Sequence, residues 1–318
     1  MKSIVTRFRA YQLGCPGSSF SFFANGQFTV LEGRLTDYSR KSLTYEMARC
    51  GVECASTLHI TSWDADHCNA KEINDLLGLI RPAKIECPGY DPHTANAMTC
   101  IEVINNYRAA RVRSNRPAEV RLITPAYIDS LDRAEELAFK DTFLNPILIN
   151  PNCPNDNSTV KHFRTGSFNV LSLGDVEDRL ISARLRRQKI LKEQTDVMIL
   201  AHHGADNGFT NKPFIERVRP HLAICSADYS NKYDHPRDEI RELLYNYGVR
   251  LMTTKTGDVV VKSIGNHNGR FRAVNLKGNS SEISSTCEFV SKKSAILSHN
   301  ADTIRQRLLP RPNYLKFR

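Results

Sequence analysis

The sequence has no apolar run close to the roughly 20 residues that a transmembrane helix needs, so no membrane span is expected. Arg7 and Arg9 stand where a secretory signal peptide requires its apolar stretch, which argues against export. No internal repeat is visible, which gives no indication of a solenoid or propeller. These absences predict a soluble protein of the cytoplasm.

The nine cysteines lack the pattern of a disulfide framework or of a zinc ribbon. Their number is odd, and the closest pair, Cys50 and Cys54, has no second pair at zinc-ribbon spacing. Reduced and mostly buried thiols are therefore expected. Any metal chemistry should then depend on histidine and aspartate.

Acidic residues are fewer than basic ones, 34 against 44, and the formal net charge of the 318-residue chain is +10. A cationic surface gains affinity for polyanions by releasing counterions from their phosphates. Nucleic acid is therefore a candidate partner, while a basic surface that serves solubility alone is the alternative.

Short β-prone runs alternate with helical patterns, which is typical of a layered α/β fold. Strands are expected at 6–13, 19–24, 27–31, 57–62, 120–124, 147–149, 168–173, 196–200 and 222–226, and helices at 70–80, 95–112, 129–139, 183–192 and 237–246. Residues 250–254 and 258–263 predict a hairpin. Because the apolar periodicity fades near Gly265, residues 1–265 are expected to form one domain and 266–318 a basic C-terminal extension.

The first cluster with chemical potential is Asp64, Asp66 and His67, directly after the strand expected at 57–62. Carboxylate oxygens and imidazole nitrogens are ligands for zinc, manganese or magnesium. The alternative is an Asp-rich cap of the helix that follows, because Asp is favoured at helix N-termini.

Three more polar clusters follow apolar strands. Asp175 comes after the run at 168–173, where an ordinary Gly-Asp turn is the alternative, and His202 and His203 come after the run at 196–200, where one surface and one buried histidine would be unremarkable. The fourth is the polar loop 226–236. If these strands share a layered sheet, all four clusters meet at one edge, and this joint pattern is far more specific than any single cluster.

The ordered set resembles the metallo-β-lactamase superfamily and, within it, the hydrolase domain of ComEC-type competence proteins. The matching segments are TSWDADH (61–67), LSLGDVED (171–178), VMILAHHGADNG (197–208) and SADYSNKYDHP (226–236). The resemblance covers about residues 8–264 and implies an αββα sandwich that carries one or two divalent metal ions, zinc or manganese or alternatively magnesium.

The resemblance also implies roles for individual residues. One ion would be held by Asp66, His67 and one of the histidines His202 and His203, and Asp175 would bridge or complete the pair. Asp64 would hold the second ion or act as base. Beyond the metal, the contacts to phosphate or to the leaving oxygen would come from Asn231, Tyr233 and His235.

The sequence departs from the family pattern at several positions. Ser62 stands where the first histidine of the motif is expected, so one of two metal positions loses a ligand, and Trp63 and Ala205 also differ from the usual residues. The family's middle histidine ligand has only positional candidates, His93 and His162.

Substrate is indicated less directly, since one fold serves many reactions. ComEC-type domains are regarded as nucleases, and a cluster around Arg184, Arg186 and Arg187 could bind phosphates or be an exposed helix face. The basic tail could grip a nucleic-acid backbone or dock a partner protein. A nuclease or phosphodiesterase is the leading hypothesis; a small-molecule phosphoester hydrolase and a degenerate nucleic-acid- or partner-binding module are the alternatives.

Overall fold

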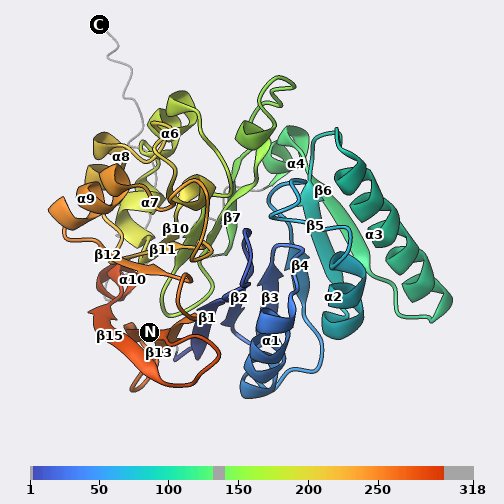
Figure 1. Cartoon of the computed structure of the whole chain (residues 1–318), viewed down its shortest axis with the longest axis horizontal. Coiled ribbons are helices and arrows are strands. Elements are labelled where there is room, and N and C mark those ends of the chain that lie inside the picture. The colour runs from blue at the N-terminus through green and yellow to red at the C-terminus, as the bar shows by residue number, and fades with distance from the viewer. Residues whose placement is uncertain (1–2, 132–139, 297–318) are drawn as a thin grey trace, which may run out of the picture.

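The computed structural model describes residues 3–131 and 140–296. Two β-sheets face each other, and helices cover the outer face of each (Figure 1). The predicted αββα sandwich is confirmed. Within the described residues no helix is long and apolar enough to cross a membrane.

The larger sheet has nine strands in the order β15-β14-β13-β1-β2-β3-β4-β5-β6. Their bounds are Thr6–Ala10 (β1), Phe20–Ala24 (β2), Gln27–Leu31 (β3), Thr57–His59 (β4), Lys84–Pro88 (β5), Glu119–Ile123 (β6), Val259–Ser263 (β13), Arg270–Leu276 (β14) and Ile283–Val290 (β15). Strands β3 to β6 run parallel, so the loops after them leave from the same edge.

The smaller sheet has six strands in the order β12-β11-β10-β9-β8-β7, of which β9 to β12 run parallel. Their bounds are Thr142–Asn145 (β7), Val160–Phe163 (β8), Val170–Ser172 (β9), Val197–Ile199 (β10), Leu222–Cys225 (β11) and Arg250–Thr253 (β12). Strands β9 and β10 are buried throughout because they are covered on both faces, which explains why their sequences read as unbroken apolar runs.

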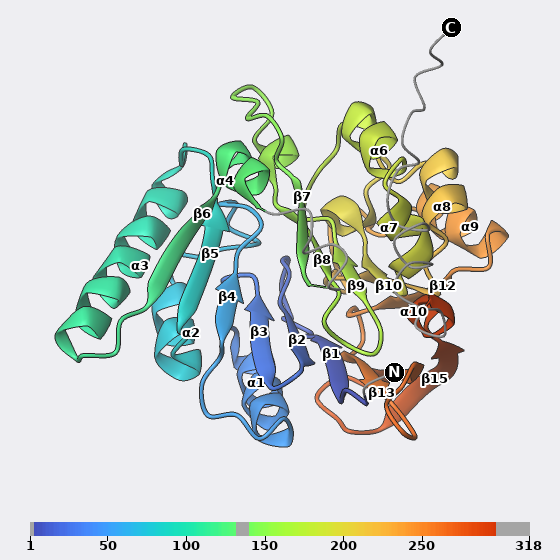
Figure 2. The same cartoon turned by 180° about the vertical axis from the view of Figure 1, so that it is seen from behind.

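The helices divide into two outer layers, one on each sheet, as both views show (Figures 1 and 2). Those of the larger sheet are α1 (Asp37–Arg49), α2 (Ile73–Ile80) and α3 (Ala95–Arg113), whereas α4 (Pro125–Ser130) contacts both β6 and β7. Those of the smaller sheet are α6 (Arg179–Leu185), α7 (Lys189–Gln194), α8 (Lys212–Val218) and α9 (Asp238–Asn246), with α10 (Lys292–Ile296) after β15 and the 3-10 turns η1 (Pro154–Asn157) and η2 (Ala201–Gly204).

Three apolar clusters correspond to the three interfaces between these layers. Phe8, Phe20 and Phe163 belong to the cluster between the sheets. Leu43 of α1 and Leu76 of α2 belong to the outer cluster of the larger sheet, and the third cluster lies between the smaller sheet and α6 to α9. Helix α1 was not predicted from the sequence, because it has no strong apolar stripe. Its N-terminus does carry a capping box, in which Thr36 is the N-cap residue.

The predicted hairpin of residues 250–263 is wrong. Strand β12 pairs in parallel with β11 in the smaller sheet, whereas β13 pairs with β1 in the larger sheet. The loop between them crosses from one sheet to the other, a connection that two adjacent β-prone runs cannot reveal. Local propensity is the same whether consecutive strands pair or separate.

The boundary expected near Gly265 does not mark the end of the sheet. Strand β14 pairs with β13 over Phe271–Asn275, and β15 pairs with β14, so residues up to Val290 extend the larger sheet. Much of β15 is exposed, because it is the edge strand, and this explains why its apolar periodicity is weak. The rest of the predicted extension, from residue 297 on, lies outside the described residues.

Other element boundaries also differ from the predictions. The single basic helix expected at 183–192 is two short helices, α6 and α7, and residues 147–149 do not form a strand. Strands β7 and β8, which were not predicted from the sequence, lie on either side of residues 147–149. The helix expected at 129–139 falls mostly outside the described residues, and α4 ends at Ser130.

Candidate metal centre

The two sheets meet at the edge where the parallel strands end. The loop after β4 carries Asp66 and His67, the loop after β9 carries Asp175, and the turn after β10 carries His203. One ligand atom from each of these four side chains lies within 4.8 Å of every other, and His67 and Asp175 are buried. Two carboxylates and two imidazoles are a donor set that suits zinc or manganese.

The contact between His67 and Asp175 fits a shared cation. Nε2 of His67 lies 2.9 Å from Oδ2 of Asp175, yet this buried nitrogen has no hydrogen-bond partner among the described residues. A buried nitrogen without a partner is costly unless something else satisfies it. A divalent cation bound by both atoms would satisfy this nitrogen.

The other nitrogen of His67 is held by two groups that sequence analysis missed. Its Nδ1 lies 3.2 Å from Oε1 of Glu32 and 3.2 Å from the hydroxyl of Thr61. Thr61 in turn donates from its hydroxyl and from its backbone N–H to the Glu32 carboxylate, at 2.7 and 3.0 Å. Such a carboxylate–histidine pair fixes the ring so that Nε2 faces the metal position.

These neighbours also set the charge of the ring. Burial alone lowers the pKa of His67, but the carboxylates of Asp175 and Glu32 outweigh it and raise the pKa well above its usual value in the metal-free protein. Burial likewise opposes ionisation of Asp175, and His67 more than offsets it and lowers the pKa of Asp175. The signal for Glu32 in the sequence is an acidic residue directly after the apolar strand β3.

The structure separates the roles of the two adjacent histidines. Both have left-handed backbone angles, φ 43° for His202 and 53° for His203, which is uncommon for residues other than glycine. His203 Nδ1 lies 2.8 Å from the Ser226 carbonyl, and its Nε2 lies 3.3 Å from Oδ2 of Asp66. His202 instead contacts the carboxylate of Glu177. His203 is therefore the member of the pair that joins the four-residue cluster.

Asp64 lies outside this cluster of four. Its Oδ2 accepts a hydrogen bond of 2.9 Å from Ser62, whose hydroxyl also lies 3.1 Å from the hydroxyl of Tyr90. Trp63 packs in the same place and donates from its indole nitrogen to the Tyr90 carbonyl. At the position where the family pattern has a histidine, the small Ser62 side chain thus has polar partners of its own.

The loop 226–236 brings one imidazole next to the cluster. The His235 ring is nearly parallel to that of His203, with centroids 6.2 Å apart, and Tyr233 stacks on its side at 5.6 Å. Burial and the neighbouring histidines His203 and His202 lower the pKa of His235 to about 4. Asn231 shapes the loop, because its side chain accepts from the His235 backbone N–H and donates to the His235 carbonyl.

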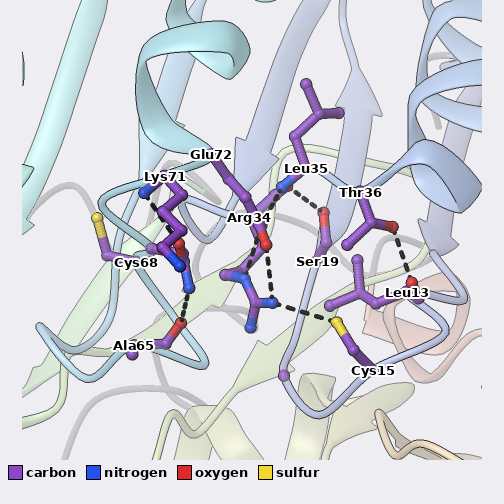
Figure 3. A network of polar contacts seen from close by, with 12 residues as sticks. Leu13, Cys15, Ser19, Arg34, Leu35, Thr36, Ala65, Cys68, Lys71 and Glu72 are labelled. Carbon is purple, nitrogen blue, oxygen red and sulfur yellow. Dashed lines mark hydrogen bonds and ion pairs between the residues drawn. The ribbon is translucent and has the colours of Figure 1, made fainter. Parts of the chain in front are cut away.

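A polar network holds the loop 13–19 against the loop that carries Asp66 and His67 (Figure 3). The Arg34 guanidinium donates to both carboxylate oxygens of Glu72, at 2.8 and 3.1 Å, and also to the Pro16 carbonyl. The backbone N–H of Ser18 then donates to the Asp66 carbonyl at 2.9 Å. Gly17 is required here, since a Cβ would lie 2.7 Å from that same carbonyl oxygen.

Several residues singled out in the sequence lie away from the cluster. His93 is exposed, and His162 is buried in β8, where burial and nearby cations lower its pKa well below the usual value. The Arg184 guanidinium donates to Asn145. Arg186 and Arg187 line a groove with residues of α8, at the opposite edge of the smaller sheet.

Comparison with known proteins finds partial relatives among competence proteins. Over 151 residues the chain is 28% identical to ComE operon protein 3 of Bacillus subtilis (strain 168), covering 45% of this chain and 19% of that protein. Over 71 residues it is 28% identical to Competence protein ComA of Neisseria gonorrhoeae, covering 22% of this chain and 10% of that protein. The match thus spans about a fifth or less of either relative. No protein-family model matches the chain.

Among solved structures, similar chains include Igni18, a metallo hydrolase of Ignicoccus hospitalis, with a TM-score of 0.45 and 11% identity over 80% of this chain and 98% of that chain. The CmlA β-hydroxylase has a TM-score of 0.45 and 10% identity over 82% of this chain and 54% of that chain.

Proposed function

We propose that this chain, which has the metallo-β-lactamase-like fold of ComEC-type proteins, is a metal-dependent phosphodiesterase that cleaves nucleic acid. The observation that carries the proposal is the cluster of Asp66, His67, Asp175 and His203, inside which a buried nitrogen of His67 lies beside Asp175 without a hydrogen-bond partner among the described residues. This donor set suits a divalent cation, and Glu32 and Thr61 hold the His67 ring so that its Nε2 faces the cation position.

The residues of the chain would divide the work as follows. Asp66, His67, Asp175 and His203 would hold one ion, which supplies Lewis acidity and lowers the pKa of a water. His235, neutral near pH 7 because of its lowered pKa, would accept a hydrogen bond from that water or contact the phosphoryl group. Asp64 remains the candidate for a second ion or a base, and Tyr233 for contact with the substrate.

Two observations favour a nucleic acid over a small phosphoester. The chain has a net charge of +10, and a polyanion gains most from such a surface because it releases many counterions. The two curated relatives are ComE operon protein 3 and a competence protein, ComA, and a role beside nucleic acid is proposed for this chain by analogy with them.

Ser62 supports a second candidate, a module that binds nucleic acid without cutting it. The buried serine and its partner Tyr90 take the place of an imidazole ligand, so a second ion would have fewer donors than the family pattern provides. This candidate predicts nucleic-acid binding without turnover under any metal.

The test is cleavage of end-labelled DNA and RNA by metal-stripped protein resupplied with zinc, manganese or magnesium. Wild type should cut with at least one metal, and Asp66→Ala and Asp175→Ala should lose both cutting and bound metal, measured by elemental analysis. Asp75→Ala is the matched control, because this carboxylate is exposed on α2 and pairs only with Arg40 among the described residues. Cleavage that survives in Asp66→Ala would remove the assignment, and binding without cleavage would favour the second candidate.

A further inference from the structure

A strongly basic groove lies at the end of the smaller sheet where β10 and β11 begin, opposite the candidate metal centre. Helices α6, α7 and α8 lie close together there in both views, with α10 beside them (Figures 1 and 2). Its volume is about 940 Å³, and its basic lining residues are Arg186, Arg187, Lys192, Arg217, Arg219 and Lys292. Lys192 and Arg219 come before β10 and β11, whereas His203 and Ser226 follow these strands, so the strands separate the groove from the metal centre.

Within the described residues no basic side chain of the groove forms an ion pair, although the carboxylates of Asp196 and Glu193 attract Lys292. Among the described residues none of its arginines pairs with a carboxylate, and Glu216 is the one acidic side chain in the lining. Instead, backbone carbonyls hold the cations in place: Arg217 Nε donates to the Arg186 carbonyl at 3.3 Å. Lys292 Nζ donates to the carbonyls of Lys192 and Val218, at 3.0 and 2.6 Å.

Lys292 is a partly buried cation of this cluster. Burial is the main reason that its pKa falls to about 8; the attraction of Asp196 and Glu193 opposes this fall, and Arg219 and Lys192 add to it. Cations held together at this density favour an anion between them. Guanidinium groups suit phosphate oxygens in particular, because their planar fork donates two parallel hydrogen bonds.

We propose that this groove is a second, non-catalytic site that binds the phosphate backbone of a nucleic acid. None of the described residues that line it is aromatic, so they offer no platform on which a base could stack, and binding there should not depend on sequence. Its cations come from three separate segments, the stretch 186–192, the end of α8 and the start of α10, which suits an extended strand of phosphates better than one small anion. The choice of nucleic acid over another polyanion rests on the proposed function.

The test measures binding without cleavage, so that it does not depend on catalysis. A fluorescein-labelled DNA duplex is titrated with the full chain carrying Asp66→Ala, in EDTA, over a series of NaCl concentrations. Adding Arg217→Gln and Arg219→Gln should reduce the slope of log affinity against log salt by about two and weaken binding about 50-fold near 0.1 M salt. The loss should be equal for duplexes of different sequence.

The matched control pair is Arg108→Gln and Arg113→Gln, which are exposed on α3 on the far side of the molecule (Figure 1). Equal weakening in this pair would overturn the proposal, because the effect would then follow net charge alone. An unchanged salt slope in the groove variant would overturn it too. The proposal would also be overturned if the groove bound pyrophosphate, measured by thermal shift, or phosphatidylserine vesicles, measured by co-sedimentation, while the duplex bound elsewhere. Metal-dependent hydrolysis of bis(p-nitrophenyl) phosphate, measured separately, shows whether the proposed function stands without the groove.

Discussion

The two nitrogens of the His67 imidazole ring have different contacts. On one side Glu32 and Thr61 hold Nδ1, and on the other Nε2 faces Asp175. His203 is held in a similar way, but by a backbone carbonyl: its Nδ1 lies against the Ser226 carbonyl, and its Nε2 faces Asp66. In each case one nitrogen is fixed so that the other is available as a ligand.

This geometry predicts that the adjacent histidines differ in effect. We expect His203→Ala to weaken zinc or manganese binding by about a hundredfold or more, since even partners of ligands are worth 10- to 100-fold. His202→Ala, the matched change one residue earlier, should weaken it less than about tenfold, because His202 contacts Glu177 and not the cluster. Competition with a chelator of known affinity measures both, and equal losses in the two variants would contradict the assignment.

At the scale of elements, Asp196, directly before β10, contacts the starts of β9, β11 and α10. Its carboxylate accepts backbone N–H groups of Asn169 and Lys292, at 2.9 and 2.8 Å, and its carbonyl accepts those of His221 and Leu222. Burial raises the pKa of this carboxyl to about 7, although the backbone donors and the nearby lysines oppose the shift. The Asp196 side chain thus ties the start of β9 to the start of α10, and its backbone carbonyl holds the start of β11.

This shift predicts a pH dependence with a definite sign. The folded state keeps the Asp196 proton up to about pH 7, whereas the unfolded chain releases it near its ordinary pKa of 3.8, so the contribution is full below about pH 4 and lost as the pH rises to about 7. The unfolding free energy of wild type minus that of Asp196→Asn should therefore decrease between about pH 4 and pH 7. Urea unfolding of both proteins across this range measures the difference, and a constant or rising difference would show that the carboxyl is ionised in the fold.

At the scale of the whole molecule, a buried ion pair joins the two sheets. Lys161 of β8 lies 2.7 Å from Glu86 of β5, which also contacts His59 and Lys84. The ammonium group lies over the rings of Phe143 and Phe163, at 4.7 and 4.9 Å from their centroids. Apolar packing dominates this interface, so the pair constrains how the sheets align in addition to holding them together.

Removing one partner should cost more than removing both. We expect Lys161→Met to lower the unfolding free energy by about 3 kcal/mol, because Glu86 then stays buried with less compensation. The double variant Lys161→Met with Glu86→Gln should recover part of that loss. Urea unfolding of the three proteins gives both values, and a double variant less stable than the single one would mean that the pair itself supplies net stability.

The order of the site motifs was visible in the sequence because each one follows an apolar run, and buried parallel strands are apolar on both faces. That pattern placed Asp66, His67, Asp175 and the histidine pair at strand ends, where the structure has them. Chain direction and local propensity suffice for this. They do not suffice for β12 and β13, whose sequences are alike in propensity and whose sheets are different.

Only the tertiary structure decided which polar groups meet. Glu32 reaches His67 across 35 positions of the chain, and the left-handed turn at His202 and His203 sends one ring to Asp66 and the other to Glu177. Arg187 and Arg217, far apart in the sequence, line one groove away from the metal centre. Strands and helices follow from local periodicity, but a contact between distant side chains depends on how the layers pack, and no local pattern encodes that packing.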